Sequence, residues 1–560
     1  MDLSGLSWFL LGSMLWFCFW IPTHCNNVPN GPKSCSELRQ LYTTKGFSPS
    51  GVPPKEISGE HLRICPQGYT CCTSEIEENL ANKSRSEFEG MVKEAGRSVQ
   101  LTLVSQHKVF DAFFQEVLNK SEKSLQENFP AMYGELYSQN VKLFKDIYGE
   151  LRRYHRGSNI NLEEALNEFW ARLLERLFKQ LNPQHQITDE YLDCMLKHAE
   201  QHHPFGEVPR ELKLRATRAF IAVRSFVQGL SLGGDVIRKV SQVPLSPECT
   251  RAIMKLVYCP HCRGLSSVKP CSNYCHNVMK GCLANQADLD AEWKNLVESM
   301  LQVADRFETP ASVEMVIGTV HIKISEAITI LEENKDHFTS KVFQGCGNLK
   351  VTAKGSGNDD KKKRGKQHNE EKFASPSGLQ LEKLVSDVKV KLRDIKDYWV
   401  ALPNALCNER IAATPSNEDK CWNGMTKSRY LPEVMGDGLA NQINNPEVEV
   451  DITKPDSLIR QQILQLKIMT NRLKNAYNGN DVDFQDASDD ISGSGSGDGC
   501  SEQACVGGSS RRSNNLNPAG SGPELKQTTQ SKNEANSKPI PTSLLFSFVV
   551  VFLAVQNHRR

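Results

Sequence analysis

Six cysteines crowd into residues 249–282 and form the densest group of reactive side chains in the sequence: Cys249, Cys259, Cys262, Cys271, Cys275 and Cys282. The Cys259-Pro-His-Cys262 motif is compatible with two chemistries. Thiolates two residues apart can ligate zinc, and a Cys-x-x-Cys pair can exchange a disulfide. Both depend on the compartment, because oxidised cysteines cannot ligate a metal as thiolates.

The N-terminus indicates an exported chain. Residues 6–21 are apolar and are followed by Pro22, as in a signal peptide, so we expect cleavage before Asn26 and loss of residues 1–25. A signal anchor is the alternative. Cleavage removes two of the 18 cysteines and leaves an even number, as in a fully oxidised secreted chain. This compartment argues against both zinc and redox catalysis.

The C-terminus predicts a membrane anchor. Residues 540–555 are short for a membrane span but suit the tail of a glycosylphosphatidylinositol (GPI) signal, so residues 534–560 are an expected propeptide. Asn533 is the predicted acceptor, with Ser531 and Ser521 as alternatives. The rival interpretation is a single-span receptor with a five-residue cytoplasmic tail.

Other candidate chemistry is sparse. The sequence has no Gly-x-Ser-x-Gly, His-Glu-x-x-His or phosphate-loop motif, so nothing supports a secreted enzyme. His198, His202 and His203 cluster, and the first two share a helix face if the segment is helical. Because Pro204 follows and no carboxylate completes a metal motif, we interpret them as a solvated helix end. We expect no metal and no cofactor.

Periodicity predicts a nearly all-α fold. The 560 residues carry 67 Lys and Arg against 66 Asp and Glu, which excludes a strongly basic nucleic-acid binder. Apolar residues recur at helical spacing in 162–181, 219–230 and 381–399, and Asn161 can cap the first of these helices. The best strand-like alternation is short, at 448–452.

Composition divides the chain. We expect a disulfide-stapled helical core at 26–478, interrupted at 351–377 by a charged segment without apolar periodicity, which is a disordered loop by composition. Residues 479–533 are rich in Ser, Gly and Asp and are predicted to form a disordered stalk.

The cysteine motifs and their flanks resemble the glypican family. The matching stretches are Cys65-Pro-Gln-Gly68 with Cys71-Cys72, Phe169-Trp-Ala-Arg-Leu173, Cys259-Pro-His-Cys262-Arg-Gly264, Lys269-Pro-Cys-Ser-Asn-Tyr-Cys275, Gly281-Cys-Leu-Ala-Asn285, Phe343-Gln-Gly-Cys-Gly347 and Cys421-Trp-Asn-Gly424 with Arg429-Tyr430. Asn475-Ala-Tyr-Asn-Gly-Asn-Asp481 looks closest to the branch of glypicans four and six. The resemblance implies an elongated helical core.

The resemblance also implies seven disulfides, which spacing alone could not select. By matching motif positions they are Cys35–Cys71, Cys65–Cys259, Cys72–Cys262, Cys194–Cys346, Cys249–Cys282, Cys271–Cys421 and Cys275–Cys407. Cys500 and Cys505 lie outside this set, and whether they pair or stay free is open.

The hydroxyls with the strongest functional signal are Ser492, Ser494 and Ser496. They form three consecutive Ser-Gly pairs behind an acidic cluster, and glycine leaves the backbone open to a transferase. Composition alone does not separate this pattern from an ordinary linker. The family resemblance implies that these serines carry heparan sulfate on a core that is not an enzyme.

The resemblance further implies a cell-surface co-receptor, GPI-anchored on the extracellular side of the plasma membrane and in part shed, that captures secreted ligands of the Wnt, fibroblast growth factor (FGF), bone morphogenetic protein (BMP) and Hedgehog classes and meets their receptors. Sulfated chains attract basic surfaces in a salt-sensitive way. The alternative is a glycan-free extracellular receptor acting through its protein core.

Two further modifications are expected. Asn82 and Asn119 fit the N-glycosylation sequon. The run Lys361-Lys-Lys-Arg364 in the charged loop is similar to a furin-type convertase site, which predicts cleavage after Arg364. An uncut, solvated basic loop is the alternative.

Overall fold

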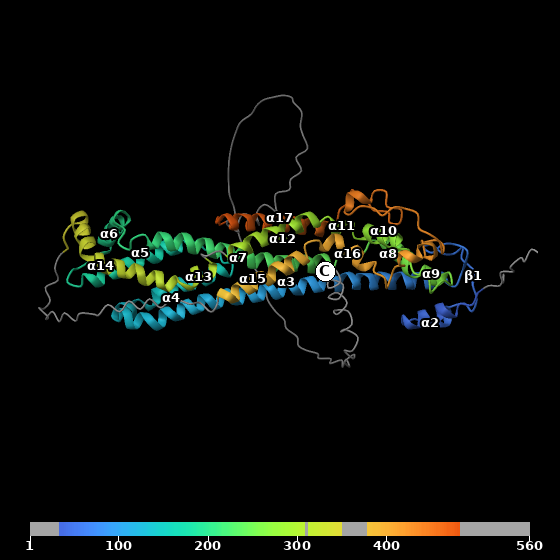
Figure 1. Cartoon of the computed structure of the whole chain (residues 1–560), viewed down its shortest axis with the longest axis horizontal. Coiled ribbons are helices and arrows are strands. Elements are labelled where there is room, and N and C mark those ends of the chain that lie inside the picture. Colours follow the sequence, from blue (N-terminus) through green and yellow to red (C-terminus); the bar gives the residue numbers. More distant parts are fainter. Residues whose placement is uncertain (1–32, 309–311, 350–377, 482–560) are drawn as a thin grey trace, which may run out of the picture. The chain divides into compact units, whose positions relative to one another are not determined.

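The computed structural model of the protein describes residues 33–308, 312–349 and 378–481 (Figure 1). All belong to the first of two units, Met1–Gly493; the second is Ser494–Arg560. The predicted signal peptide, the 351–377 loop with Arg364, the three attachment serines, Cys500, Cys505 and Asn533 lie outside the described residues.

Regular structure in the described part is almost entirely helical, which confirms the predicted all-α class. The α-helices are α2 (Ser36–Thr44), α3 (Ser74–Tyr133), α4 (Glu135–His155), α5 (Leu162–Leu181), α6 (Asp189–His202), α7 (Val208–Val240), α8 (Pro247–Val257), α9 (Cys259–Cys262), α10 (Ser272–Cys282), α11 (Ala284–Ala287), α12 (Asp290–Arg306), α13 (Val313–Gly318), α14 (Val320–Cys346), α15 (Gly378–Asp394), α16 (Tyr398–Leu406) and α17 (Ser457–Asn478). Short 3-10 turns are η1 (Pro49–Gly51), η2 (Pro415–Lys420) and η3 (Leu439–Gln442).

Side-chain caps fix where several helices begin. The Asn161 side chain accepts hydrogen bonds from the backbone N–H groups of Glu163 and Glu164, which confirms the predicted cap of α5. Thr73 caps α3 through the N–H of Ile76. The 60 residues of α3 make a helix about 90 Å long at 1.5 Å per residue. This helix contributes side chains to both hydrophobic cores of the protein.

The larger of these cores, which we call the bundle core, is built on α3 from Leu103 onward together with α4, α5, α7, α12, α14, α15 and α17. Helix α7 packs most extensively on α3 and α17 (Figure 1). It is long and apolar enough to cross a membrane, but 78% of its apolar window is buried within the protein. Packing in the core therefore accounts for its hydrophobicity.

The second core, which we call the cysteine-rich core, joins α2, the start of α3, α8, α9, α10, α16 and the loops between 407 and 450. Two short strands, β1 (Ile57–Ser58) and β2 (Tyr69–Thr70), pair antiparallel at its edge. The Glu77 carboxylate, only 4% exposed, accepts backbone N–H bonds from Arg63, Ile64 and Cys65 at 2.7–2.9 Å and so holds the loop that precedes β2.

Two expectations about local structure are wrong. Residues 448–452 form no strand: Val448 packs on Gly281 of α10, and no strand within the described residues pairs with this segment. The predicted helix at 381–399 is broken into α15 and α16. At the break, the Ile395 carbonyl accepts two hydrogen bonds, one from the indole N–H of Trp293 (2.8 Å) and one from the backbone N–H of Tyr398 (3.2 Å), so a tertiary contact supports the local turn.

Candidate functional site

The described part of the chain contains seven disulfides, and their pairing is the one that the family resemblance implies. The two cysteines of the Cys259-Pro-His-Cys262 motif bond to Cys65 and Cys72, not to each other. The motif is therefore neither a thioredoxin-like redox pair nor a thiolate metal site. It fastens the N-terminal loop to the centre of the cysteine-rich core.

The point where the chain leaves the core for the predicted stalk is held by side chains from three helices. Helix α17 ends at Gly479, whose φ of 85° is left-handed and suits glycine. A Cβ at this position would also meet the Arg218 side chain at 3.0 Å. Two residues on, the Asp481 carboxylate accepts a hydrogen bond from the Tyr154 hydroxyl (2.8 Å).

Neighbouring charged groups stabilise the hydrogen bond between Tyr154 and Asp481. The Arg224 guanidinium lies over the Tyr154 ring at 4.5 Å. Burial, together with the Asp481 charge, raises the pKa of Tyr154 well above its usual range, so the phenol stays a donor at neutral pH. The last described residue of the core is thus fastened between α4 and α7. Ser492 follows eleven residues later, within about 40 Å of Asp481 whatever path the chain takes.

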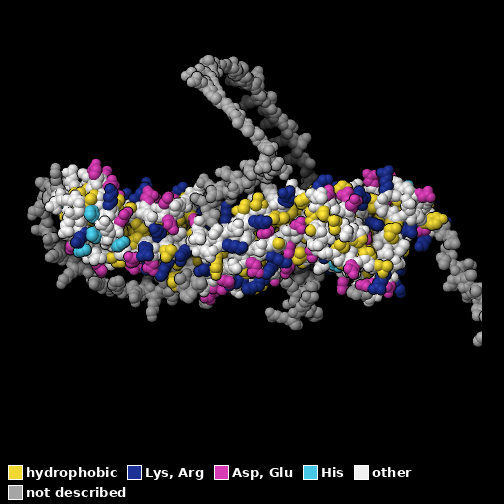
Figure 2. All heavy atoms as spheres, turned by 90° about the horizontal axis from the view of Figure 1, so that it is seen from above, with side chains coloured by type: hydrophobic (Ala, Val, Ile, Leu, Met, Phe, Trp, Pro, Cys, Tyr) yellow, Lys and Arg dark blue, Asp and Glu magenta, His cyan; other side chains and the backbone are white. Residues whose placement is uncertain are grey.

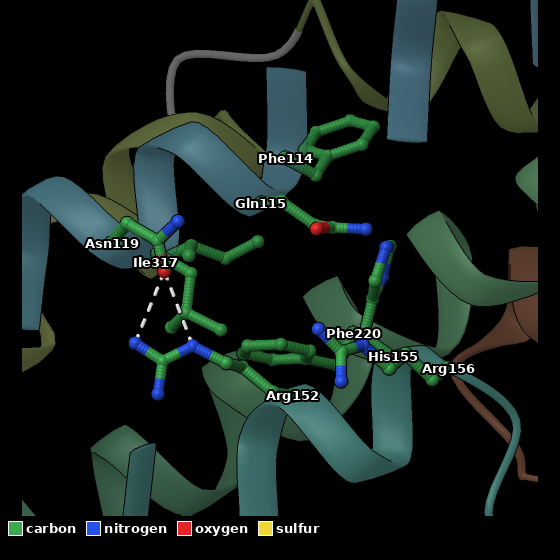
Figure 3. A pocket seen from close by; sticks show the side chains of 9 residues that line it. Phe114, Gln115, Asn119, Arg152, His155, Arg156, Phe220 and Ile317 are labelled. Carbon is green, nitrogen blue, oxygen red and sulfur yellow. Dashed lines mark hydrogen bonds between the residues drawn. The ribbon is translucent and has the colours of Figure 1, made fainter. Parts of the chain in front are cut away.

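A small cavity lies among α3, α4, α7 and α13 (Figure 3). Its volume is about 50 Å³, and its wall is lined by Phe114, Gln115, Leu118, Asn119, Arg152, His155, Arg156, Phe220 and Ile317. Figure 3 shows the Arg152 guanidinium donating to the Asn119 carbonyl oxygen, at 3.0 and 3.1 Å. The lining offers no hydroxyl or thiol nucleophile.

The charges around this cavity are largely compensated. Arg152 pairs with Glu122, and the His155 Nε2 lies 2.8 Å from an Asp111 carboxylate oxygen. Burial, with the neighbouring charge of Arg156, lowers the pKa of Arg152 from its usual value. A space of this size holds a few water molecules. It is far smaller than the roughly 300–1,000 Å³ of a typical small-molecule site.

Comparison with known proteins identifies the family. The glypican family profile matches residues 17–557, nearly the whole chain. The chain belongs to the glypican family. It is 65% identical to Glypican-1 of Gallus gallus over 529 residues, covering 94% of this chain and 95% of the relative. It is 59% identical to Glypican-1 of Homo sapiens, with 93% of each covered.

Solved glypican structures share the fold. The crystal structure of C-terminally truncated glypican-1 is 60% identical, covers 80% of this chain and 100% of its own, and superposes with a TM-score of 0.73. A structure of Dally-like protein in complex with O-palmitoleoyl serine is 32% identical, with the same coverages and a TM-score of 0.62. The chain is thus the core protein of a heparan sulfate proteoglycan, and glypicans are cell-surface proteins.

The assignment of this glypican to the branch of glypicans four and six is wrong, because the relatives at 59–65% identity are Glypican-1 proteins. The misleading motif, residues 475–481, covers the end of α17 and the stalk exit. There the left-handed Gly479 and the Asp481–Tyr154 contact constrain the sequence structurally, so a match in this short stretch says little about the branch.

Both N-glycosylation sequons of this glypican lie on α3, with exposed asparagine side chains at Asn82 and Asn119. The third residue of each is buried. Ser121 is 2% exposed and lies within hydrogen-bonding distance of the Tyr148 hydroxyl (2.8 Å) and His321 Nδ1 (3.2 Å). In the Asn119 amide, the oxygen is held by Arg152 while the side chain stays exposed.

The interpretation of the three histidines as a solvated helix end fails for one of them. His202 and His203 are exposed, but His198 is half-buried beside the Cys194–Cys346 disulfide. The sequence did contain a signal for this placement, since Cys194, His198 and His202 recur every four residues along α6. Local spacing could not bring Cys346 to this face, because it is 152 residues from Cys194; only the family resemblance paired the two cysteines.

Proposed function

We propose that this glypican carries heparan sulfate on Ser492, Ser494 and Ser496 and acts as a co-receptor for secreted ligands. The observation that carries the proposal is the run of three Ser-Gly pairs directly behind an acidic cluster. The fastening of Asp481 to Tyr154 supports it, because the attachment segment then starts from a fixed point on the core.

The chemistry of capture is that of a polyelectrolyte. Sulfated chains raise the local concentration of ligands with basic surfaces and speed their association, and salt weakens both effects. Wnt, FGF, BMP and Hedgehog ligands, together with their receptors, are the proposed partners. No catalytic activity is part of the proposal.

The proposal is tested by removing the three serines and, in a separate experiment, the heparan sulfate chains. Changing Ser492, Ser494 and Ser496 together to Ala should turn a diffuse high-mass smear on a gel into a discrete band, and heparan-sulfate lyase should do the same to the unchanged protein. A lyase-sensitive smear that persists in the triple variant would place the chains elsewhere. Unchanged ligand capture after lyase treatment would contradict the co-receptor role.

We propose that the signal peptide, residues 1–25, is removed and that Asn533 receives a GPI anchor. Phosphatidylinositol-specific phospholipase should then release the protein from expressing cells. A single-span receptor would stay on the membrane, and mass spectrometry of surface material would then find peptides from residues 544–560.

We also propose convertase cleavage after Arg364. The helix that follows the loop, α15, is well held: Leu381, Val385, Val388 and Leu392 are buried in the bundle core, and Lys389 pairs with Asp305 (2.7 Å) and Glu308 (2.6 Å). Cys271–Cys421 and Cys275–Cys407 tie the second piece covalently. Lyase-treated protein should therefore run as one species without reductant and as two with it; one band under both conditions contradicts cleavage.

N-glycans on Asn82 and Asn119 are a further proposal, supported by the exposure of both side chains on α3. Treatment with peptide N-glycosidase should increase mobility, and Asn82→Gln and Asn119→Gln should each remove one step of that shift. Because Ser121 is buried in a hydrogen-bond network, Asn119→Gln is a cleaner test of the second site than a change of Ser121.

The glycan-free alternative, in which the core binds ligands directly, has one point in its favour: the structural relative was solved with O-palmitoleoyl serine. The cavity of about 50 Å³ in this chain is too small for an acyl chain unless the surrounding helices separate. Ligand capture by the triple Ser→Ala variant at the level of the parent would favour this alternative.

A further inference from the structure

One disulfide of the bundle core lies beside an imidazole. Cys194 on α6 bonds Cys346 at the end of α14, and His198 lies one turn beyond Cys194. The two sulfur atoms and one ring nitrogen of His198 all lie within 4.8 Å of one another. Figure 2 shows histidine side chains gathered at the end of the core where Figure 1 places α6.

A glycine makes this approach possible. A Cβ built on Gly345 would lie 2.1 Å from Nε2 of His198, which real Cβ contacts do not allow. Any larger residue at 345 would push the imidazole away from Cys346. In addition, Nδ1 of His198 is buried and has no hydrogen-bond partner. Buried polar atoms normally have such a partner. Hydrogen bonding of Nδ1 therefore does not account for the position of the His198 ring.

This disulfide is also the most accessible of the seven. In the other six at least one cysteine is buried, whereas Cys194 and Cys346 are both partly exposed. Because both sulfur-bearing residues are partly exposed, a thiolate reductant can approach the bond, and access is one of the factors that sets the rate of exchange.

Opening the bond need not release the helices that it joins. Leu192 and Met195 of α6 and Phe338 and Val342 of α14 are buried in the bundle core. The Tyr191 hydroxyl donates to the Gly347 carbonyl at 2.9 Å, a second link between the same two segments. The two thiols would thus stay close to each other and to His198.

We propose that Cys194, His198 and Cys346 form a latent site for a thiophilic metal ion of the Zn²⁺ or Cu⁺ class, which reduction of the disulfide opens. A dithiol supplies two electrons and two protons, is itself oxidised to a disulfide, and leaves two protein thiols. Binding of Zn²⁺ then releases the two thiol protons and forms two metal–sulfur bonds and one metal–nitrogen bond, with water in the fourth position. Soft thiolates with one imidazole select this class of ion.

The test uses the full-length protein after heparan-sulfate lyase treatment, so that sulfate groups do not bind the probe. Limited dithiol is added without oxygen, and alkylation with peptide mapping identifies the opened bond. Co²⁺ then serves as the spectroscopic probe for Zn²⁺. We expect Cys194 and Cys346 to open first and one equivalent of Co²⁺ to bind, with a thiolate-to-cobalt charge-transfer band and tetrahedral d–d bands that Zn²⁺ abolishes.

Variants assign the ligands. Loss of a residue that only supports a metal ligand typically lowers metal affinity by about tenfold or more. Loss of the ligand itself should cost more, so His198→Ala should weaken Co²⁺ binding by more than about tenfold. The matched control His337→Ala, an exposed histidine on α14, should bind as the parent does. Cys194→Ser with Cys346→Ser should abolish the charge-transfer band. Helical circular dichroism verifies folding, and His198→Asn replaces His198→Ala if the alanine variant misfolds.

Three results would overturn the proposal. One is opening of any of the other six disulfides of the described part before Cys194–Cys346. Another is the absence of a thiolate–cobalt band once these two thiols are free. The third is Co²⁺ binding of equal strength before and after reduction, or in both the His198 variant and the parent.

Discussion

The cysteine-rich core contains six of the seven disulfides, whereas the bundle core contains one, at its edge. In the first, short helices and long loops pack around buried sulfur. In the second, long helices bury continuous apolar faces, as in α5 and α7. Loops bury too little apolar surface to offset their own ordering entropy, so covalent bonds stabilise the first region and helix packing the second.

Four of the six disulfides of the cysteine-rich core form two adjacent pairs. Cys65–Cys259 and Cys72–Cys262 close nearly the same loop, as do Cys271–Cys421 and Cys275–Cys407. Once one bond of a pair is present, the second restricts the unfolded chain very little. Its contribution is to fix the direction of the segment, which explains the closely spaced cysteines of Cys259-x-x-Cys262 and of Cys271 with Cys275.

The largest effect should come from removing both bonds of one pair. Changing Cys65, Cys72, Cys259 and Cys262 together to Ser should abolish secretion, because the loop before α3 then loses both covalent links to the centre of the cysteine-rich core. Cys194→Ser with Cys346→Ser should lower the free energy of unfolding by about 2–5 kcal/mol and still yield secreted protein. Secretion yield and chemical unfolding measure both; equal loss of secretion would remove the distinction between the cores.

The next test uses matched tryptophans. Trp293 in the bundle core donates to the Ile395 carbonyl (2.8 Å), and Trp422 in the cysteine-rich core donates to the Lys255 carbonyl (2.9 Å). Trp422→Phe leaves the part-buried Lys255 carbonyl without this partner, at about 1–3 kcal/mol. Trp293→Phe removes one of the two hydrogen bonds that the Ile395 carbonyl accepts, since the Tyr398 N–H also donates to it (3.2 Å), so we expect a cost at the lower end of this range. We expect two unfolding transitions, with Trp293→Phe shifting only the earlier one and Trp422→Phe only the later. A single transition shifted by both would mean that the two cores unfold together.

A smaller effect is expected at the stalk exit. Tyr154→Phe removes the hydroxyl that donates to Asp481 and should cost about 1–2 kcal/mol locally. Hydrogen exchange should increase at the end of α17, and proteases should cut sooner near residue 481, with little change in global unfolding. Tyr477→Phe is the control, because its ring can stay under Arg306, 4.3 Å from the guanidinium. Unchanged exchange in Tyr154→Phe would contradict the fastening.

The smallest expected effect is a pH dependence of the free energy of unfolding, to which one histidine in each core contributes. Burial lowers the pKa of His321 in the bundle core and of His261 in the cysteine-rich core. Below the ordinary histidine pKa of about 6.5, the unfolded chain takes up protons that the folded chain resists, so stability falls as the pH drops. His321→Gln should reduce this loss for the bundle transition, and the exposed His337→Gln should not. An equal pH slope in parent and His321→Gln would contradict the assignment.

The helices of the bundle core and their class follow from the sequence because their apolar residues repeat at a period set by the backbone. The Asn161 cap and the α7 face are local patterns, readable within one segment. The disulfide pairing came with the family resemblance, since residues as far apart as Cys65 and Cys259 carry no local sign that they meet. The break between α15 and α16 could not be predicted either, because Trp293 lies 102 residues away.

The sequence by itself determined the all-helical class, the oxidised cysteines and the position of the Ser-Gly pairs, because each is a property of neighbouring residues. Only the tertiary structure decided that His198 lies against Gly345 and Cys346, that Ser121 of a sequon is buried beside His321, and that Asp481 meets Tyr154. Each of these contacts joins segments that lie far apart in the sequence, and the packing of the helices rather than local periodicity decides which residues meet.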